Sequence, residues 1–470
     1  MLPIASHATR RRVAAACACV ALAGGCSDDA APVEERARET RAPATSTPEA
    51  RAGRCDVPRR ASPPGAVPHY DMAVDVDPAR GLVEGRSRVT FVADRATRRL
   101  VFRLWPNGPR LAAEGTELTV ESARVDGASV ERPDPTTLVF ELGRRLPPGE
   151  EVTARMRWTL ELPGPVYDRI SNRGDAIRLG SFFPILSWEG ERGWATDPPT
   201  TTLAESSTSP TADFDVKVRA PAALQVIATG RATADGAWTA EDVRDFAVAV
   251  GRFDEVRTAV DTVHGPVDVT VGVAEGLDAD ARAFSDAIDR ALVDLSRRYG
   301  AYPWDTFSMA IVPDLGRSGI EYPAMVFQGE DSLRTATTHE VAHSWFYGLV
   351  GNNQARDPWL DEGITSWAQA RGDGVLGYFR DYDVSEAAAG ELGRGMTFWD
   401  PREDLYYRGV YEQGVKALDA LGDPTLTDCA LRRYVALEAY GVATNEDLVD
   451  ALRAVYPRAG RVLARFGVRP

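Results

Sequence analysis

Alternating apolar and polar residues dominate the chain from about Pro68 onward. In the run Tyr70–Val76, the two kinds of side chain alternate with period two, which is typical of a strand with one buried face. Further runs of this kind, separated by turns rich in Gly and Pro, are Ser87–Val92, Leu138–Leu142, Val152–Trp158 and Phe214–Arg219. So many short strands predict an antiparallel β-sandwich or a saddle-shaped sheet.

A helical pattern replaces this alternation from about residue 258 onward. The segment Ala281–Tyr299 carries apolar residues three or four positions apart, as on one face of a helix. Phe307–Val312 is typical of a short buried strand. The sequence therefore predicts a multidomain α+β chain, with an N-terminal β domain over residues 67–257 and a mainly α domain over residues 258–470.

Residues 1–26 have the organisation of an export signal peptide. Arg10–Arg12 form a positively charged segment, and the apolar run Val13–Gly25 is too short to span a bilayer as a stable helix. The sequence Leu-Ala-Gly-Gly-Cys at 22–26 resembles a bacterial lipobox, in which Cys26 is lipidated. An ordinary cleaved signal, with Cys26 incidental, is the alternative. We expect an exported protein that is either anchored to the cell membrane by a lipid or secreted.

A polar segment follows this signal peptide. Residues 27–66 are rich in Ala, Pro, Arg and Glu and poor in large apolar residues, which predicts a flexible tether.

Three of the five cysteines lie in residues 1–26, which excludes a disulfide scaffold, and the lack of Cys-x-x-Cys pairs excludes a zinc ribbon. Cys55 and Cys429 either pair outside the cytoplasm or remain free, and the sequence leaves both options open.

The charge balance narrows the functional classes. The 470 residues include 54 basic and 69 acidic side chains, a net charge of −15, and such a chain repels the phosphate backbone of nucleic acids. Hydrophobic residues make up 44% of the chain, which is enough for packed cores. We therefore expect a folded protein that does not bind nucleic acids; its oligomeric state is not predicted.

The strongest chemical signal is His-Glu-Val-Ala-His at residues 339–343, an H-E-x-x-H motif in an apolar segment. Because residues four apart share one helix face, His339 and His343 can point at one metal ion. Eighteen residues separate His343 from Glu362, which lies on a second predicted helix. Catalytic zinc takes three such ligands and keeps one open position. The alternative, two solvated histidines on an exposed helix, is disfavoured because the chain contains only five histidines.

Together the motifs resemble those of the gluzincins, the zinc aminopeptidase family that includes aminopeptidase N and leukotriene hydrolase. H-E-x-x-H, eighteen residues and then Glu362 within Trp-Leu-Asp-Glu-Gly is the family pattern. Gly319–Pro323 occupies the place of its G-x-M-E-N exopeptidase motif, and Tyr411–Val415 resembles its Y-x-K-G-A segment. The resemblance implies a thermolysin-like catalytic domain after the β domain. Because the chain ends soon after Tyr411, we expect a short, lipoprotein-like form with no large C-terminal helical domain.

The resemblance also implies a role for each matching residue. His339, His343 and Glu362 would hold one zinc ion, which polarises the scissile carbonyl and activates a water molecule. Glu340 would take the proton of that water and pass it to the leaving amine. Tyr411 would donate a hydrogen bond to the oxyanion of the tetrahedral intermediate.

The resemblance implies that Gly319–Pro323, in the place of the exopeptidase motif, recognises the substrate. Glu321, together with Gly319, would bind the free α-ammonium group of a peptide; an ordinary carboxylate on an edge strand is the alternative for Glu321. The motif departs from the family pattern at Ile320 and Tyr322, and Ser181–Pro184 lacks the glutamine that gives relatives a second amine contact. Recognition of the amine then depends on Glu321 alone.

Two further positions carry open alternatives. Tyr406 and Tyr407 compete with Tyr411 for the catalytic position, which we assign to Tyr411 because Tyr411–Val415 resembles the Y-x-K-G-A segment. Asp361 stands where many relatives have asparagine. It either orients a zinc ligand or only complements the dipole of its helix.

The sequence therefore predicts an exported zinc metallopeptidase, and specifically an aminopeptidase that acts on peptides with a free N-terminus. A zinc endopeptidase without that requirement is one alternative. A non-catalytic binding lipoprotein that keeps the fold is another, and the intact set of ligands and catalytic residues argues against it.

Overall fold

The structure of the protein, a computed structural model, describes residues 55–202 and 208–469, which belong to one compact unit of the chain. The predicted signal peptide over residues 1–26, with Cys26, and residues 27–54 of the predicted tether lie outside the described residues. Among the described helices, none combines the length and the apolar character that spanning a bilayer requires.

Strands dominate the described chain up to Ala274, and side-chain burial alternates along Tyr70–Val76 and Ser87–Val92 as the pattern predicts. The predicted alternation is wrong at Leu138–Phe140, where all three side chains are buried. The largest sheet contains, in spatial order, β13 (Arg231–Ala232), β14 (Ala237–Val243), β11 (Ala212–Arg219), β1 (His69–Asp77), β2 (Leu82–Val92), β7 (Glu151–Glu161) and β4 (Glu117–Arg124). Its pairs are antiparallel except β1 and β11, which run parallel. The prediction of an entirely antiparallel sheet is therefore wrong at this pair, where a long connection replaces a hairpin.

Two four-stranded antiparallel sheets complete this part of the chain. One contains β10 (Ile185–Leu186), β3 (Thr97–Arg103), β6 (Thr137–Leu146) and β5 (Ala128–Asp134), and the other β12 (Gln225–Ala228), β15 (Val248–Gly251), β9 (Ala176–Leu179) and β8 (Ile170–Asn172). Short helical turns lie at η1 (Trp105–Asn107), α2 (Pro109–Ala113) and η2 (Gly190–Arg192). Apolar faces of the sheets share one core, in which the ring of Tyr70 stacks on Phe214 with centroids 4.5 Å apart.

A five-stranded sheet begins the second part. Its order is β16 (Phe253–Thr262), β17 (Gly265–Ala274), β18 (Thr306–Ile311), β20 (Met325–Gln328) and β19 (Gly319–Tyr322). Helix α3 (Ala281–Tyr299) has the bounds that its apolar spacing predicts, begins at the capping residue Asp280, and packs against β16 and β17. Because β19 is the last strand of this sheet, one of its edges is available to the helices that follow.

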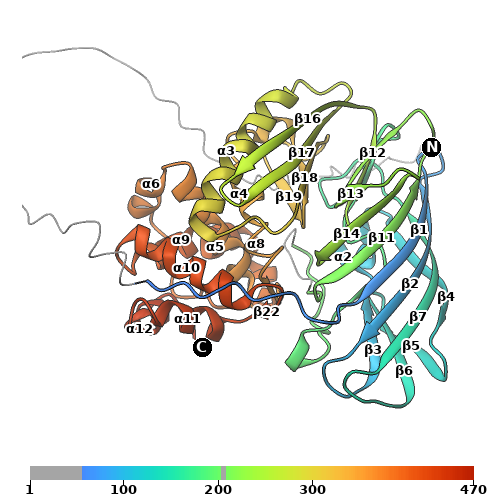
Figure 1. Ribbon diagram of the computed structural model, residues 1–470, viewed down its shortest axis with the longest axis horizontal. Coiled ribbons are helices and arrows are strands. Elements are labelled where there is room, and N and C mark those ends of the chain that lie inside the picture. The colour runs from blue at the N-terminus through green and yellow to red at the C-terminus, as the bar shows by residue number, and fades with distance from the viewer. Residues whose placement is uncertain (1–54, 203–207, 470) are drawn as a thin grey trace, which may run out of the picture. The chain divides into compact units, whose positions relative to one another are not determined.

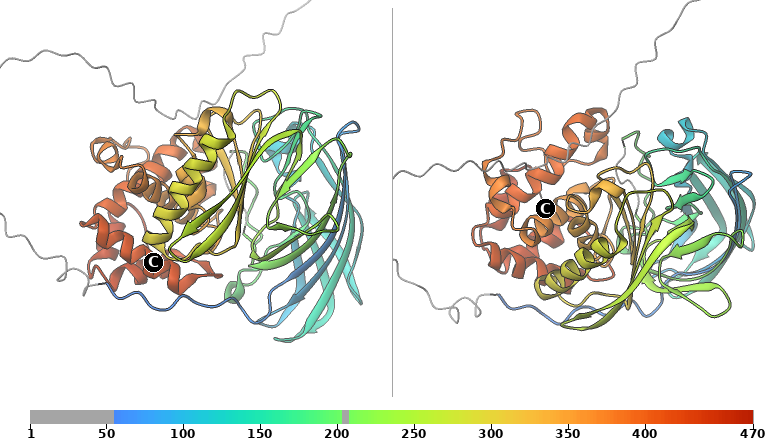
Figure 2. Two further views of the ribbon diagram at one scale, coloured as in Figure 1. Left: turned by 45° about the horizontal axis from the view of Figure 1, so that its top comes forward. Right: turned by 90° about the horizontal axis from the view of Figure 1, so that it is seen from above.

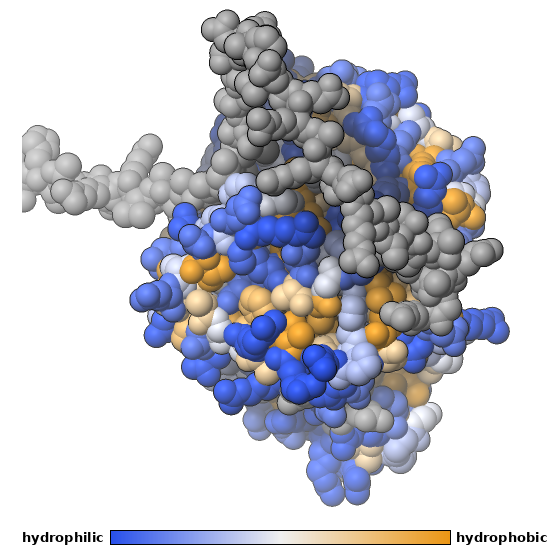
Figure 3. Space-filling view, turned by 90° about the vertical axis from the view of Figure 1, so that its left-hand side faces the viewer, coloured by the Kyte–Doolittle hydropathy of each residue, from blue (hydrophilic) through white to orange (hydrophobic). Residues whose placement is uncertain are grey.

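Helices make up most of the remaining chain and lie on one side of the five-stranded sheet (Figures 1 and 2). They are α4 (Thr337–Ala342), α5 (Pro358–Gly372), α6 (Leu376–Asp381), α7 (Met396–Trp399), α8 (Glu403–Tyr406), the π-helix η5 (Tyr407–Glu412), α9 (Gln413–Asp419), α10 (Pro424–Glu438), α11 (Asn445–Arg453) and α12 (Ala459–Ala464). Shorter elements are η3 (Glu330–Ser332), β21 (Gly351–Asn352), η4 (Asp400–Arg402) and β22 (Val442–Ala443). In Figure 3, which faces this helical side, apolar residues gather near the middle with hydrophilic residues around them.

The predicted α+β class, with a sheet-rich N-terminal part, is confirmed. The domain boundaries and the absence of a large C-terminal helical domain stay predictions.

Residues 55–61 lie against the rest of the chain rather than forming a free tether. Cys55 forms a disulfide with Cys429 on α10, the backbone N–H of Ala61 donates to the carbonyl oxygen of Ala436 at 2.8 Å, and Arg60 donates to the carbonyl of Ala301 at 2.8 Å. In Figure 1 this segment runs in blue along α10 toward β1. The prediction of a flexible tether is therefore wrong for these residues, because a covalent bond and backbone hydrogen bonds replace the missing apolar contacts.

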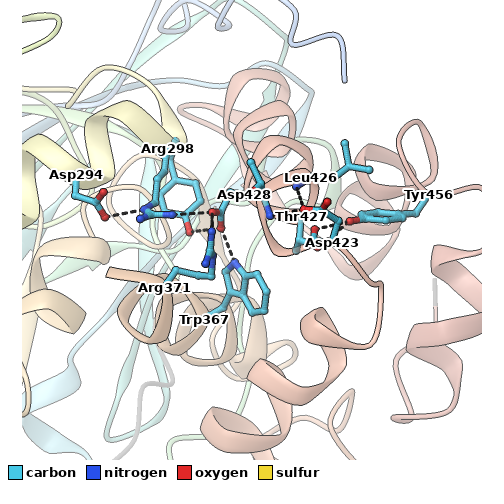
Figure 4. A network of polar contacts seen from close by, with 11 residues as sticks. Asp294, Arg298, Trp367, Arg371, Asp423, Leu426, Thr427, Asp428 and Tyr456 are labelled. Carbon is cyan, nitrogen blue, oxygen red and sulfur yellow. Dashed lines mark hydrogen bonds and ion pairs between the residues drawn. The ribbon is translucent and has the colours of Figure 1, made fainter. Parts of the chain in front are cut away.

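A buried carboxylate on α10 ties three helices together (Figure 4). Asp428 accepts hydrogen bonds from Arg298 on α3 and from Trp367 and Arg371 on α5, each at 2.9 Å. The two guanidinium groups and the indole N–H offset the free-energy cost of burying this carboxylate. The cluster therefore fixes the direction of α5, the helix that carries Glu362.

Helix α5 also makes a backbone-to-backbone contact with η5 and α9. A Cβ atom added at Gly414 would lie 2.5 Å from the Cα of Gly363, and one added at Gly363 would lie 3.1 Å from the carbonyl oxygen of Val410. Only residues without side chains fit at this crossing. The crossing sets the distance between Glu362 and Tyr411.

Replacing Gly414 by alanine should force α9 away from α5 and lower the free energy of unfolding by about 1–3 kcal/mol, the usual cost of overpacking. Urea unfolding followed by circular dichroism measures the change. Gly377→Ala on α6 is the control, since a Cβ there meets nothing within 4 Å. A Gly414→Ala protein as stable as the parent would contradict the close packing.

Candidate active site

The H-E-x-x-H motif and Glu362 meet between α4 and α5. The rings of His339 and His343 lie 4.7 Å apart in a T-shaped arrangement. An oxygen of Glu362 lies 3.1 Å from Nε2 of His339 and 3.5 Å from Nε2 of His343, and the three ligand atoms lie within 4.8 Å of one another. All three side chains are buried. The structure thus brings together the three predicted ligands from two helices.

The donor set fits zinc. Two imidazole nitrogens and one carboxylate oxygen are the ligands of many catalytic zinc sites, which use three protein ligands and one open position. Two more buried carboxylates, Glu340 and Asp361, flank this set. Carboxylates thus outnumber the imidazoles at this buried place, and a divalent cation would balance that charge.

The pKa values of the three predicted ligands reflect the closely spaced charges at this site. Burial alone would raise the pKa of Glu362, but hydrogen bonds from His339 and His343 outweigh burial and lower that pKa. Burial lowers the pKa of His339. For His343, burial is outweighed by the carboxylates of Glu321 and Asp361, which raise its pKa well above the ordinary value. Both histidines therefore interact strongly with neighbouring carboxylates.

Asp361 contacts a predicted ligand directly. One of its oxygens lies 2.8 Å from Nδ1 of His343, and the other accepts a hydrogen bond from Gln354 at 2.7 Å. The carbonyl of Phe346 and the hydroxyl of Thr365 lie 3.1 and 3.3 Å from the same Nδ1. With Nδ1 engaged in this way, Nε2 is left to face Glu362. Of the two alternatives for Asp361, this contact favours orientation of the ligand.

His339 is supported by Gln369, which sequence reasoning missed. Gln369 forms a hydrogen bond with the imidazole and donates from its own amide to the carbonyl of Thr335 at 2.8 Å. Gln369 follows Glu362 by two helical turns, so it lies on the same face of α5. Its spacing of seven residues from Glu362 is the signal that could have identified it, and Thr365, three residues after Glu362, gives a similar signal. Gln354 gives none.

Gly319 makes room for Glu340. A Cβ atom added at Gly319 on β19 would lie 2.5 Å from the carboxyl carbon of Glu340. Any other residue there would displace that carboxylate, which is buried next to the two histidines. The edge strand β19 therefore supports the residue predicted as the proton acceptor.

Glu321 points into the same cluster from β19. It is only 7% exposed, and one of its oxygens lies within 4.8 Å of ligand atoms of His343 and Asp361. A solvated edge-strand carboxylate, the alternative in the sequence analysis, is wrong because the side chain is buried. The neighbouring Tyr322 packs on Gly180, where an added Cβ would meet its hydroxyl, so residues 181–184 begin directly beside β19.

Of the three tyrosines that compete for one role, Tyr411 stacks on His339. The ring centroids are 5.8 Å apart and the planes differ by 11°. Tyr406 and Tyr407 pack around Tyr411, with centroids 5.8 and 4.8 Å from it. Burial, followed by the charge of Glu362, raises the pKa of Tyr411 well above its ordinary value. Tyr411 therefore stays protonated over a wide pH range and can donate a hydrogen bond.

Comparison with known proteins gives partial sequence matches. No protein-family model matches the chain. Human aminopeptidase B is 27% identical over 211 residues, which cover 38% of this chain and 32% of that protein, and mouse aminopeptidase B is 31% identical with the same coverage. Leukotriene A-4 hydrolase of Xenopus laevis is 27% identical over 176 residues, 32% of this chain and 29% of that protein. The chain thus spans about a third of the length of the curated relatives it matches.

Solved structures match over most of the chain. An M1 zinc metallopeptidase from Deinococcus radiodurans superposes with a TM-score of 0.65 and 21% identity, covering 86% of this chain and 94% of that chain. A mutant of that metallopeptidase bound to a Tyr-Ser-Ala substrate gives the same TM-score at 20% identity. At this identity the likeness shows that the chain has the fold of the M1 metallopeptidases.

Removing the contact between Asp361 and His343 should weaken metal binding. We expect Asp361→Ala to lower the affinity for zinc by about 10- to 100-fold, the usual effect of losing a residue that orients a ligand, and Asp361→Asn to lower it less because an acceptor oxygen remains. Competition with a chromophoric chelator measures the affinity. Asp286→Ala, at an exposed position of α3, is the control. Unchanged affinity in a folded Asp361→Ala protein would show that Asp361 does not orient the ligand.

Proposed function

We propose that this chain, which is similar to the gluzincin aminopeptidases in its motifs, its sequence relatives and its fold, is a zinc-dependent aminopeptidase. The single observation that carries the proposal is the convergence of His339, His343 and Glu362 beside the buried carboxylate of Glu340. The substrates we propose are peptides with a free N-terminus.

The first step of the reaction depends on Glu340. Bound zinc would polarise the scissile carbonyl and lower the pKa of a water molecule toward neutrality. Glu340 accepts the proton of that water and later donates it to the leaving amine, as a positioned general base and acid. Gly319 leaves room for this carboxylate, because a side chain at 319 would collide with it.

Tyr411 stabilises the charge that develops on the carbonyl oxygen. Its hydroxyl remains neutral because its pKa is raised by burial and by Glu362. Its ring is held against His339, so the neutral hydroxyl is kept near the predicted ligands, where it can donate a hydrogen bond to the developing oxyanion. The π-helix η5 positions this hydroxyl, and such helices are frequent at functional sites.

Glu321 selects the free N-terminus. A buried carboxylate forms a strong charge-assisted hydrogen bond with an α-ammonium group, and this contact fixes the first peptide bond of the substrate at the catalytic residues. An acetylated N-terminus carries no charge and keeps only one N–H donor. The aminopeptidase proposal therefore depends on Glu321, and an endopeptidase would not need it.

The zinc-loaded protein should hydrolyse Leu-Gly-Ala and leave N-acetyl-Leu-Gly-Ala intact, and a chelator should abolish the reaction. We expect Glu340→Gln to bind zinc normally and to lower kcat by about 100- to 10,000-fold, the usual contribution of general acid–base catalysis. Chromatographic detection of released leucine measures each rate.

Glu386→Gln, an exposed glutamate, is the matched control. Equal cleavage of the free and acetylated peptides would favour the endopeptidase, and the lack of any hydrolysis by the zinc-loaded parent would favour the binding lipoprotein.

We also propose that the protein is exported and anchored to the membrane through Cys26. The pattern of residues 1–26 supports export, and so does the Cys55–Cys429 disulfide, since disulfides persist in oxidising compartments outside the cytoplasm.

Fractionation of cells tests this second proposal. The parent should sediment with membranes, whereas Cys26→Ser should appear in the soluble extracytoplasmic fraction. Equal distribution of the two proteins would refute lipid anchoring, and retention of both in the cytoplasm would refute export.

A further inference from the structure

A row of aromatic rings leads from the predicted metal ligands toward solvent. The ring of Tyr411 stacks on His339 at 5.8 Å, and the ring of Tyr407 lies 4.8 Å from that of Tyr411. Exposure rises along the row, since His339 is 9% exposed, Tyr411 is partly buried and Tyr407 is 39% exposed. The row is therefore a continuous aromatic surface between the ligand cluster and the outside.

The two tyrosines are held by one rigid element. Both belong to η5, four residues apart, so their side chains are neighbours on the helix surface. The segment is fixed from behind, because Gly409 packs on Trp399 and Gly414 crosses α5 at Gly363. Tyr407 is thus presented to solvent by a segment that cannot easily move.

The predicted amine anchor is buried, whereas the aromatic row reaches solvent. Glu321 is 7% exposed and has an oxygen within 4.8 Å of ligand atoms of His343 and Asp361. A peptide whose ammonium group meets Glu321 therefore has its first residue inside the buried cluster. Residues after the scissile bond then extend toward solvent, the direction in which exposure rises along the aromatic row.

We propose that Tyr407 is a specificity-determining residue, which contacts the side chain that follows the scissile bond and favours an aromatic or large aliphatic one. The inference rests on the proposed aminopeptidase function. A tyrosine ring offers an apolar face to a substrate side chain. Covering a partly exposed ring with an apolar side chain removes apolar surface from water, which is favourable.

The test compares Leu-Phe-Ala with Leu-Gly-Ala, which share the first residue and differ only in the second. We expect the zinc-loaded parent to have the higher kcat/KM for Leu-Phe-Ala. Tyr407→Ala should lower this value by about three- to tenfold, the size of one aromatic contact, and should change the value for Leu-Gly-Ala by less than about twofold. Tyr407→Phe should retain the preference.

Tyr378→Ala is the matched control. Tyr378 is 37% exposed, nearly the same as Tyr407, and its ring packs on Phe379 and Tyr382 of its own segment. This substitution should leave kcat/KM unchanged for both peptides. It separates a contact at Tyr407 from a general effect of removing an exposed tyrosine.

Binding to a protein that does not turn over the peptides gives a second readout. In the Glu340→Gln background, calorimetric titration should show that Tyr407→Ala weakens binding of Leu-Phe-Ala and leaves that of Leu-Gly-Ala unchanged. An equal loss for both peptides would mean that Tyr407 only supports Tyr411, and this result or an unchanged preference would overturn the proposal. A parent that hydrolyses neither peptide would refute the proposed function, and the binding comparison would still decide the role of Tyr407.

Discussion

The burial of four carboxylates around two imidazoles is the constraint on which the rest of the structure depends. Glu321, Glu340, Asp361 and Glu362 are all buried within the same cluster. Each unpaired charge in such a place costs several kcal/mol, and two histidines balance only part of the negative charge. Bound protons or a cation must supply the remainder. A divalent ion held by imidazole and carboxylate atoms meets this requirement, so electrostatics and the sequence motif lead to the same proposal.

Such a cluster is useful only if its helices cannot move apart, and the helical part of the chain provides that rigidity. Asp428 ties α5 to α3 and α10 through two arginines and a tryptophan (Figure 4). The crossing of Gly363 and Gly414 holds α5 against α9 at backbone distance. Between these two contacts, Glu362 and Tyr411 have little freedom, which is the preorganisation that catalysis at a fixed site requires.

The sheets supply the other half of the site. β19 is the edge strand of the five-stranded sheet, and it brings Gly319 against Glu340 and Glu321 toward His343. Tyr322, from the same strand, packs on Gly180 in the N-terminal part of the chain. The proposed amine anchor therefore lies buried where both parts meet, while the aromatic row of Tyr411 and Tyr407 leads toward solvent. This arrangement gives the proposed substrate a direction.

The sequence by itself determined the features that depend on residue spacing within a single element. The spacing of His339 and His343 follows from the helical repeat, and the apolar spacing of Ala281–Tyr299 gave the bounds of α3, because both patterns repeat over a few residues. Contacts between distant segments decided the rest. The burial of Glu321, the contact of Asp361 with His343, the stacking of Tyr411 on His339 and the pairing of Cys55 with Cys429 each join residues that no short period relates. A sequence pattern encodes which face of an element is buried, and only the packing of complete elements decides which side chains meet there.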